Sequence, residues 1–421
     1  MDVVKQLNFL FFLEVVIIIS SSFEFGGSEL FYIAPSSCHV KPCLTLSQFA
    51  ANTSWLQSNT SLIFLRGNHS LNLEVTISDI YNFSMFSNLA LAGFQVDTQV
   101  ICQQNANFKF DNISYLWIKG LRFVGCGNNR VLSVNKLIVE GCTFHGQRNS
   151  GTALEIIHTN ASIENSHFIS NTLGSCCCHF IGPNSLCAHV GGAITIATHS
   201  NVTILKCMFV GNSAEIGGAV YVDLGSTITT LNSTFIENYV APTKFSINDT
   251  QCSSSALNVI SLRDNNFVMT ELPSEAVLLE GRYCIGSVFA MLRSRTVIDG
   301  CLFRNNINEY GGAGGLYLLK SFATISNSRF WNSTVQQFGG VLSAYGTSMT
   351  FDNCTFHDSS AYDGGAMDIM YSSVMITDST FDGNTAKVYG GAILVDQGSR
   401  MNVSGSCFFN NRAESGGHCL Q

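Results

Sequence analysis

Short runs of alternating apolar and polar residues recur along the chain at intervals of about 25 residues. Near the C-terminus, a Gly pair is followed by an apolar run at 392–395, a second run at 401–403 and a third at 407–409. A repeat of about 25 residues with three short strands is too short for a βαβ unit, and no 3.6-residue periodicity accompanies it. The pattern predicts an all-β fold, a single-stranded right-handed parallel β-helix of about 10–13 coils, or rungs.

A Phe preceded two residues earlier by Cys or Ser marks most repeats. It occurs at Phe144, Phe168, Phe209, Phe235, Phe303, Phe330, Phe356, Phe381 and Phe409, with a looser copy at Phe123. In several repeats an Asn follows three residues later, and then a Gly pair. Representative rung residues are Phe209, Asn212, Gly217, Gly218, Phe303, Asn306, Gly311, Gly312, Phe381, Asn384, Gly390 and Gly391.

These residue types have structural reasons to recur. Each residue should lie one strand spacing, about 4.8 Å, above its copy in the preceding rung. Phe should then stack on Phe in the core, and the Asn amides should form a ladder along a turn that tolerates left-handed backbone. The Gly pair should allow a corner with positive φ. The repeat motif therefore predicts the body of the protein and indicates no chemical activity.

The domain organisation follows from where the repeat begins and is interrupted. Residues 1–22 carry Lys5, an apolar run and small residues at plausible cleavage positions, which is typical of a signal peptide. We expect residues 23–60 to form an N-terminal cap and residues 61–421 to form the β-helix. Inserts at 172–190 and 240–285 interrupt the same part of the rung, between Phe and the Gly pair, so both should leave one corner. Recognition elements of solenoids often lie at such a place, and tolerated loops without a ligand are the simpler interpretation.

Composition and charge favour a secreted protein. The 421 residues have a net charge of -8 and show no basic stripe, which argues against nucleic acid as a partner. Sixteen Cys and a set of N-x-S/T sequons suit an oxidising, extracellular compartment. The sequons begin at Asn52, Asn59, Asn68, Asn82, Asn112, Asn160, Asn201, Asn232, Asn248, Asn332, Asn353 and Asn402. No later apolar stretch is long enough for a transmembrane helix in the mature chain.

The paired motifs resemble those of known repeat proteins. Phe209–Asn212 with Gly217–Val220, and Phe381–Asn384 with Gly390–Ile393, are similar to the repeats of chlamydial polymorphic outer membrane proteins. They also resemble right-handed β-helix (pectin-lyase-like) proteins of sponges and other invertebrates. The similarity covers roughly residues 120–421. It implies the β-helix fold and, from the chlamydial proteins, surface display and adhesion.

The Cys residues fall into two groups. Cys142, Cys207, Cys301, Cys354 and Cys407 lie two residues before a Phe and alternate with Ser in the intervening rungs. Cys neighbours in this column are about 9.6 Å apart, beyond the Cα distance of about 6.8 Å that a disulfide allows. We expect these five side chains to point inward as buried free thiols.

The other Cys residues are disulfide candidates. They are Cys38, Cys43, Cys102, Cys126, Cys176, Cys177, Cys178, Cys187, Cys252 and Cys284. Cys38 with Cys43, Cys102 with Cys126 at one rung, and Cys252 with Cys284 are plausible pairs. The cluster at 176–187 could form two bridges or, with His179 and His189, bind zinc. Cys419 has no partner, and no polar cap follows Gly416, so the chain is expected to be truncated at its C-terminus.

The sequence carries no convincing active site, cofactor site or metal site. Glycoside hydrolysis needs two carboxylates about 5–9.5 Å apart. Asp223 and Asp396 share one slot of the rung but are five rungs apart. The best pair is Asp358 with Asp382, beside His357, and solvated turn carboxylates are the simpler interpretation. Polygalacturonase and lyase motifs and a Gly-rich phosphate loop are absent.

The function favoured by the sequence is a non-enzymatic extracellular or cell-surface scaffold for recognition or adhesion. The expected partner is an extracellular protein or a glycan. A structural matrix component without a specific ligand and a carbohydrate-active enzyme are the alternatives.

Overall fold

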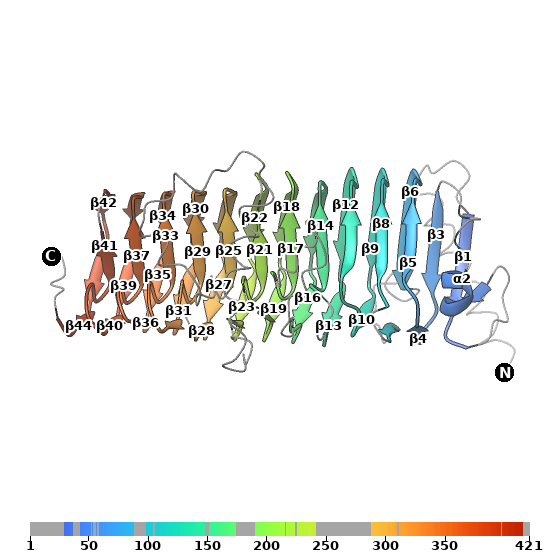
Figure 1. Cartoon of the computed structure of the whole chain (residues 1–421), viewed down its shortest axis with the longest axis horizontal. Helices are drawn as coiled ribbons and strands as arrows, with labels where there is room; N and C mark the ends of the chain where they lie inside the picture. The colour runs from blue at the N-terminus through green and yellow to red at the C-terminus, as the bar shows by residue number, and fades with distance from the viewer. Residues whose placement is uncertain are drawn as a thin grey trace, which may run out of the picture.

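The chain folds as a right-handed parallel β-helix (Figure 1). The structure, a computed structural model, describes residues 29–36, 43–51, 53, 56, 59–87, 98–103, 106–147, 151–173, 190–214, 216–223, 225–240, 288–309, 311–396 and 398–415. Each strand pairs in parallel with its copy in the next rung. Four sheets, here named A, B, C and D, run along the helix.

Sheets A and B form two faces of the helix. In spatial order, sheet A contains β2 (Cys43–Thr45), β1 (Glu29–Ala34), β3 (Thr60–Phe64), β6 (Asn82–Ser87), β9 (Tyr115–Lys119), β12 (Lys136–Glu140), β15 (Asn160–Glu164), β18 (Asn201–Leu205), β22 (Thr227–Leu231), β26 (Arg295–Asp299), β30 (Phe322–Ser326), β34 (Ser348–Asp352), β38 (Ser373–Thr377) and β42 (Arg400–Ser404). Sheet B contains β4 (Gly67–Leu71), β7 (Thr98–Cys102), β10 (Arg122–Val124), β13 (Thr143–His145), β16 (His167–Ile169), β19 (Met208–Val210), β23 (Thr234–Ile236), β27 (Leu302–Arg304), β31 (Arg329–Trp331), β35 (Thr355–His357), β39 (Thr380–Asp382) and β43 (Cys407–Phe409).

Sheets D and C complete each rung. Sheet C contains β5 (Val75–Ser78), β8 (Phe108–Asp111), β11 (Asn129–Leu132), β14 (Leu154–Ile157), β17 (Ile194–Ala197), β21 (Val220–Val222), β25 (Phe289–Leu292), β29 (Leu316–Leu319), β33 (Leu342–Tyr345), β37 (Met367–Met370) and β41 (Ile393–Val395). The two-residue strands of sheet D, which the sequence did not predict, are β20 (Ser213–Ala214), β24 (Tyr239–Val240), β28 (Ile307–Asn308), β32 (Thr334–Val335), β36 (Ser360–Ala361), β40 (Thr385–Ala386) and β44 (Arg412–Ala413).

A short helix lies at the N-terminal end. Helix α2 (Leu46–Ala51) follows β2, which pairs with β1 at the edge of sheet A. Its buried residues Leu46 and Phe49 belong to the same hydrophobic core as the rungs.

The core contains the stacked column of Phe rings that the repeat predicts. The rings from Phe123 to Phe408 lie in nearly parallel pairs with centroids 4.5–5.0 Å apart. The last member was assigned wrongly: Phe408, not Phe409, pairs with Phe381. Two consecutive Phe residues fit the motif there, and only the register distinguishes them. Burial of a large ring in every rung supplies much of the driving force for folding.

The Asn ladder is present at the corner between sheets B and D. The Asn171 amide donates to Asn212 Oδ1 at 2.9 Å, and Asn212 donates to Asn238 Oδ1 at 3.0 Å. Each Asn Oδ1 also accepts the backbone N–H of the previous rung, as in Asn171 N to Asn212 Oδ1 at 3.1 Å. The ladder Asn residues do not have positive φ, contrary to the expectation; the preceding residue does, as with Glu237 at 54°.

The Gly pair forms the corner between sheets D and C, and its two members have different roles. Gly364 has a φ of 65°, which favours Gly. A Cβ on Gly340 would lie 2.0 Å from the carbonyl oxygen of Gly365, so this second position needs Gly for close packing between rungs. The assignment of Gly311 and Gly312 to this corner is wrong. The register places Gly314, not Gly312, against Gly340.

Replacing Asn212 by Leu should destabilise the fold by about 3 kcal/mol or more, because several buried polar groups in adjacent rungs lose their partners. The measurement is urea unfolding followed by circular dichroism. Asn135→Leu, at an exposed position, serves as the matched control and should change stability by less than about 0.5 kcal/mol. Equal effects of the two substitutions would contradict a stabilising role for the ladder.

Candidate functional site

The structure brings together the carboxylates that the sequence singled out. His357 lies at the end of β35, with its Nδ1 at 2.8 Å from Asp358 Oδ2 and its Nε2 at 3.4 Å from Asp382 Oδ2. Asp382 Oδ1 also accepts a hydrogen bond from Asn410. The exposed ring of Trp331 lies next to the imidazole, with centroids 5.1 Å apart.

This arrangement resembles a column of stacked surface side chains more than a hydrolytic dyad. A dyad needs a sugar between two carboxylates, whereas the ring of His357 occupies the space between Asp358 and Asp382. Asp223 and Asp396 lie five rungs apart, as the register from Val222 to Val395 shows. They cannot act on one bond.

A pocket of about 300 Å³ lies elsewhere, at the corner between sheets C and A. Its floor is a grid of two columns over four rungs. The corner column is Lys320, Gly346, Tyr371 and Gly398, and the column that begins the sheet A strands is Phe322, Ser348, Ser373 and Arg400. Because Gly346 and Gly398 have no side chains, the surface is hollow between the larger residues.

Two corner residues of this pocket occupy backbone conformations that bulky residues rarely adopt. Lys320 has a φ of 48° and Tyr371 a φ of 49°. The same corner has positive φ in other rungs, as at Asn112, His158 and Arg293, so this conformation is a regular feature of the corner and is not confined to the pocket. Left-handed backbone at a bulky residue costs about 1–2 kcal/mol.

The pocket combines exposed rings with hydroxyl groups. Phe322 is 57% exposed and Tyr371 is 41% exposed, although large aromatic residues are usually buried. The Arg295 guanidinium lies over the ring of Phe322, 5.8 Å from its centroid, and the Tyr345 and Tyr371 rings are 5.2 Å apart. Ser348 and Ser373 line the floor. Flat apolar faces beside hydroxyl groups suit a ligand with the same mixture, such as a saccharide.

Sequence reasoning missed this pocket. The signal was present as Lys320 and Tyr371 alternating with Gly346 and Gly398 at one corner position, but that position is identified only from the pairing of successive rungs. A ladder of hydroxyl groups fixes that corner: Ser321 N donates to Thr347 Oγ1, and Thr347 N donates to Ser372 Oγ at 3.0 Å.

A buried acid lies on the outer side of sheet C. Asp368 in β37 is fully buried, and neither carboxyl oxygen has a hydrogen-bond partner among the described residues. Burial raises the pKa of Asp368 to about 7, and the carboxyl groups of Asp363 and Asp396 add to the shift. Asp368 faces Tyr317, whose pKa burial raises to about 12.

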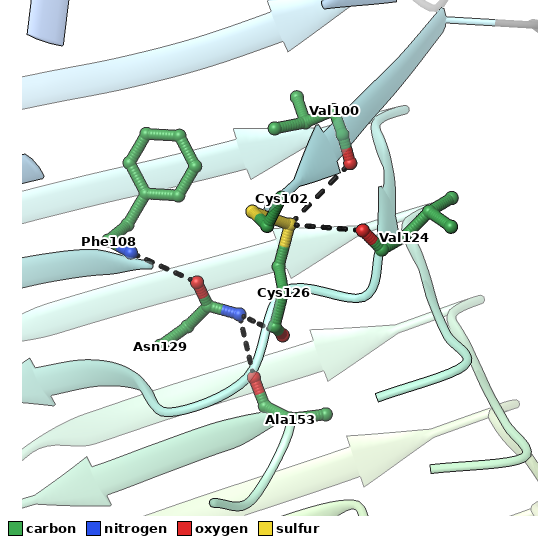
Figure 2. Close-up of a disulfide and its surroundings, with 7 residues drawn as sticks. All are labelled: Val100, Cys102, Phe108, Val124, Cys126, Asn129 and Ala153. Atoms are coloured by element: carbon green, nitrogen blue, oxygen red, sulfur yellow. Dashed lines mark hydrogen bonds between the residues drawn. A yellow bond between two sulfur atoms is a disulfide. The ribbon is translucent and has the colours of Figure 1, made fainter. Parts of the chain in front are cut away.

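A disulfide joins Cys102 and Cys126, with Cα atoms 4.9 Å apart (Figure 2). Their spacing of one rung predicted this pair. Cys126 lies three residues after Phe123, in the slot that later rungs fill with Asn. Nearby, Asn129 Nδ2 donates to the carbonyl oxygens of Cys126 and Ala153, each at 2.9 Å (Figure 2).

Cys43 is also disulfide-bonded. Its expected partner Cys38 lies outside the described residues. So do Cys176, Cys177, Cys178, Cys187, Cys252, Cys284 and Cys419, together with the alternative zinc ligands His179 and His189.

The thiols at the corner between sheets A and B are free, and four are buried: Cys142, Cys207, Cys301 and Cys354. They form a ladder with Ser, in which Cys301 N donates to Ser328 Oγ at 3.1 Å. Cys407 is also a free thiol, as predicted, but the prediction that it is buried is wrong. Ser406 takes the ladder slot, accepting from Ser379 N at 3.0 Å, and Cys407 is exposed beside Thr380.

The described sequon residues lie at the surface. Those that are exposed are Asn68, Asn112, Asn160, Asn201, Asn232, Asn332, Asn353 and Asn402, and the half-buried ones are Asn59 and Asn82. Asn52 and Asn248 lie outside the described residues. The ladder residues Asn171, Asn212, Asn238, Asn306 and Asn384 are buried and belong to no sequon. None of the described sequon Asn residues is buried.

The flanks of the two inserts lie at one corner. Thr172 bridges to Ser213 before the first insert, and β24 ends at Val240 before the second. The chain returns at Val190, bridged to Ile216, and at Val288 before sheet C. Residues 174–189 and 241–287, like the leader at 1–22, lie outside the described part of the chain.

The part of the chain that the structure describes lacks two features, a membrane-spanning helix and a metal-binding cluster. None of its helices is long and apolar enough to cross a membrane. It contains no group of three or more His, Cys, Asp or Glu side chains placed to hold a metal ion.

Comparisons with known proteins agree with the fold. The family model described as "Right handed beta helix region" matches residues 314–419. The chain is a right-handed parallel β-helix protein. It is 30% identical over 142 residues to "Metabotropic glutamate receptor-like protein R" of Dictyostelium discoideum. That match covers 33% of this chain and 9% of the length of the Dictyostelium protein.

Solved structures with a similar path of the chain include polysaccharide lyases. Pectate lyase Pel9A has a TM-score of 0.34 at 12% identity, covering 93% of this chain and 79% of the lyase. A mannuronic acid specific polysaccharide family 6 lyase from human gut microbiota has a TM-score of 0.35 at 10% identity, covering 89% and 87%. No substrate or activity is transferred from these similarities.

In the folded protein at pH 8, iodoacetamide should modify Cys407 and leave Cys142, Cys207, Cys301 and Cys354 unmodified. Burial raises the pKa of Cys142 to about 12 and that of the other three to about 11, so almost no thiolate is present. Peptide mapping by mass spectrometry, with and without denaturant, measures this. Labelling of Cys207 in native protein would show that the ladder thiols are accessible.

Asp368→Asn should stabilise the protein by about 1–3 kcal/mol at pH 8 and have little effect at pH 4. The folded-state pKa of Asp368 is raised, so its favourable neutral form persists at low pH. Stability is lost as pH rises from about 4 through about 7. Thermal unfolding against pH tests this, with Asp111→Asn as the control. A gain that does not depend on pH would contradict the assignment.

Proposed function

We propose that the chain is an extracellular, non-catalytic recognition scaffold that binds a saccharide in the pocket between sheets C and A. The observation that carries the proposal is the pair of exposed rings, Phe322 and Tyr371, held over a hydroxyl-lined hollow at a rigid corner. The hydroxyl ladder at this corner fixes the backbone, so the pocket exists before a ligand arrives. Such preorganisation reduces the entropic cost of binding.

Three observations support an extracellular location. The leader at 1–22 has the composition of a signal peptide. The described sequons are on the surface. The disulfide between Cys102 and Cys126 suits an oxidising compartment. Recognition at a cell surface or in a matrix is the role that this location and a ligand pocket favour together.

Polysaccharide cleavage is a second candidate function, favoured by the contact of His357 with both Asp358 and Asp382. A His with two carboxylates beside the exposed ring of Trp331 contains groups that general acid–base chemistry uses. The cluster is on sheet B, away from the pocket, so the two candidates are separable by substitution.

Tyr371→Gly should weaken saccharide binding about tenfold, because it removes a stacking surface worth about 1–1.5 kcal/mol while retaining a residue that tolerates positive φ. The secreted protein is screened on a glycan array, and hits are measured by titration calorimetry. Tyr81→Gly, which removes an exposed ring far along the helix, is the matched control.

The outcomes separate the alternatives. Absence of any saccharide ligand, or equal effects of Tyr371→Gly and Tyr81→Gly, would reject the pocket and favour a structural component. Release of new reducing or unsaturated ends from the same polysaccharides, abolished by His357→Ala, would instead establish the enzyme.

A further inference from the structure

The charges of the pocket have one sign. Lys320 lies at one end of the grid and Arg400 at the other, and no lining residue is Asp or Glu. Arg295 lies next to Phe322 in the same column, one rung before it. The whole chain carries a net charge of -8, so this concentration of cations runs against its average composition.

The spacing of these cations matches an extended ligand. Phe322, in the rung of Lys320, and Arg400 are separated by three rungs, about 14 Å at the usual strand spacing. The ring of Tyr371 and the hydroxyls of Ser348 and Ser373 lie between the two ends. A ligand along the helix axis would meet a cation, a hydroxyl-lined floor with a flat ring, and a second cation.

From this arrangement we infer that the ligand is an acidic oligosaccharide, bound parallel to the helix axis with its anionic groups at Lys320 and Arg400. The inference rests on the proposed function and specifies its ligand class. Arg400 has the planar donor set that pairs with a carboxylate or a sulfate. Lys320 acts as a point charge, and the ring of Tyr371 packs on a sugar face.

The double variant Lys320→Asn/Arg400→Gln tests the charge requirement. Asn is compatible with the left-handed backbone at 320, and neither substitution creates a sequon. Lys136→Gln is the matched control, because Lys136 is an exposed cation in the same outward column as Arg400, many rungs away. Circular dichroism and thermal unfolding verify that each variant folds as the wild type does.

Binding is measured by calorimetry with three probes of similar length: oligogalacturonate for a carboxylate, a heparin-derived oligosaccharide for a sulfate, and a cello-oligosaccharide as the neutral reference. Since Asn402 follows Arg400 by two residues, the series is repeated after enzymatic removal of N-glycans. The wild type should prefer one acidic probe over the neutral one, and about 1 M salt should abolish the preference.

The double variant should lose at least about tenfold in affinity for the acidic probe, which is the loss of one charge-assisted contact. Lys136→Gln should lose nothing. Stronger binding of the neutral probe, still dependent on Tyr371, would overturn the inference while leaving the proposed function intact. Failure of all saccharides to bind at the pocket would overturn both. The carboxylate and sulfate arms identify which anion is recognised.

Discussion

The rest of the structure depends on one constraint, that equivalent residues of successive rungs stack in register. At every corner of a rung the backbone leaves the sheets, and its N–H groups need acceptors inside the protein. At three of the four corners side-chain ladders supply them: Asn between sheets B and D, Ser with Cys between A and B, and Ser with Thr between C and A. At the Gly corner between D and C, backbone carbonyl groups of the next rung accept, as in Gly340 N to Gly364 O at 3.1 Å. Each ladder forms only if the equivalent position of the next rung carries a side chain that can accept a hydrogen bond.

This constraint also determines where variation is tolerated. Inward positions of the rung carry the aliphatic side chains and Phe rings of the core, and the hydroxyl, thiol and amide groups of the ladders. Outward slots at the corner between C and A are free to differ, so Lys320, Gly346, Tyr371 and Gly398 can succeed one another without disturbing the ladder beneath them. The hollow and its charges are therefore a product of side-chain choice on a fixed backbone.

The same logic explains how the cluster of His357, Asp358 and Asp382 on sheet B arises. His357, Asp358 and Asp382 come close because adjacent rungs place them in neighbouring slots. Their proximity follows from stacking, because outward side chains at equivalent positions of adjacent rungs lie about one strand spacing apart. Short contacts between such side chains therefore arise without any catalytic role. A pocket that combines exposed rings, hydroxyl groups and cations is a more selective sign of function than proximity alone.

The sequence by itself determined the fold class, the Phe column, the buried thiols and the pair Cys102–Cys126, because each depends on a period that can be counted along the chain. It failed where two residues fitted one slot, as with Phe408 and Phe409, and where Gly311 and Gly312 stood close to the corner pair without forming it. Tertiary structure decided these cases and the pocket. Interstrand hydrogen bonds set the register between successive rungs. Only this register brings Lys320, Tyr371 and Arg400, up to 80 residues apart in the chain, onto one surface.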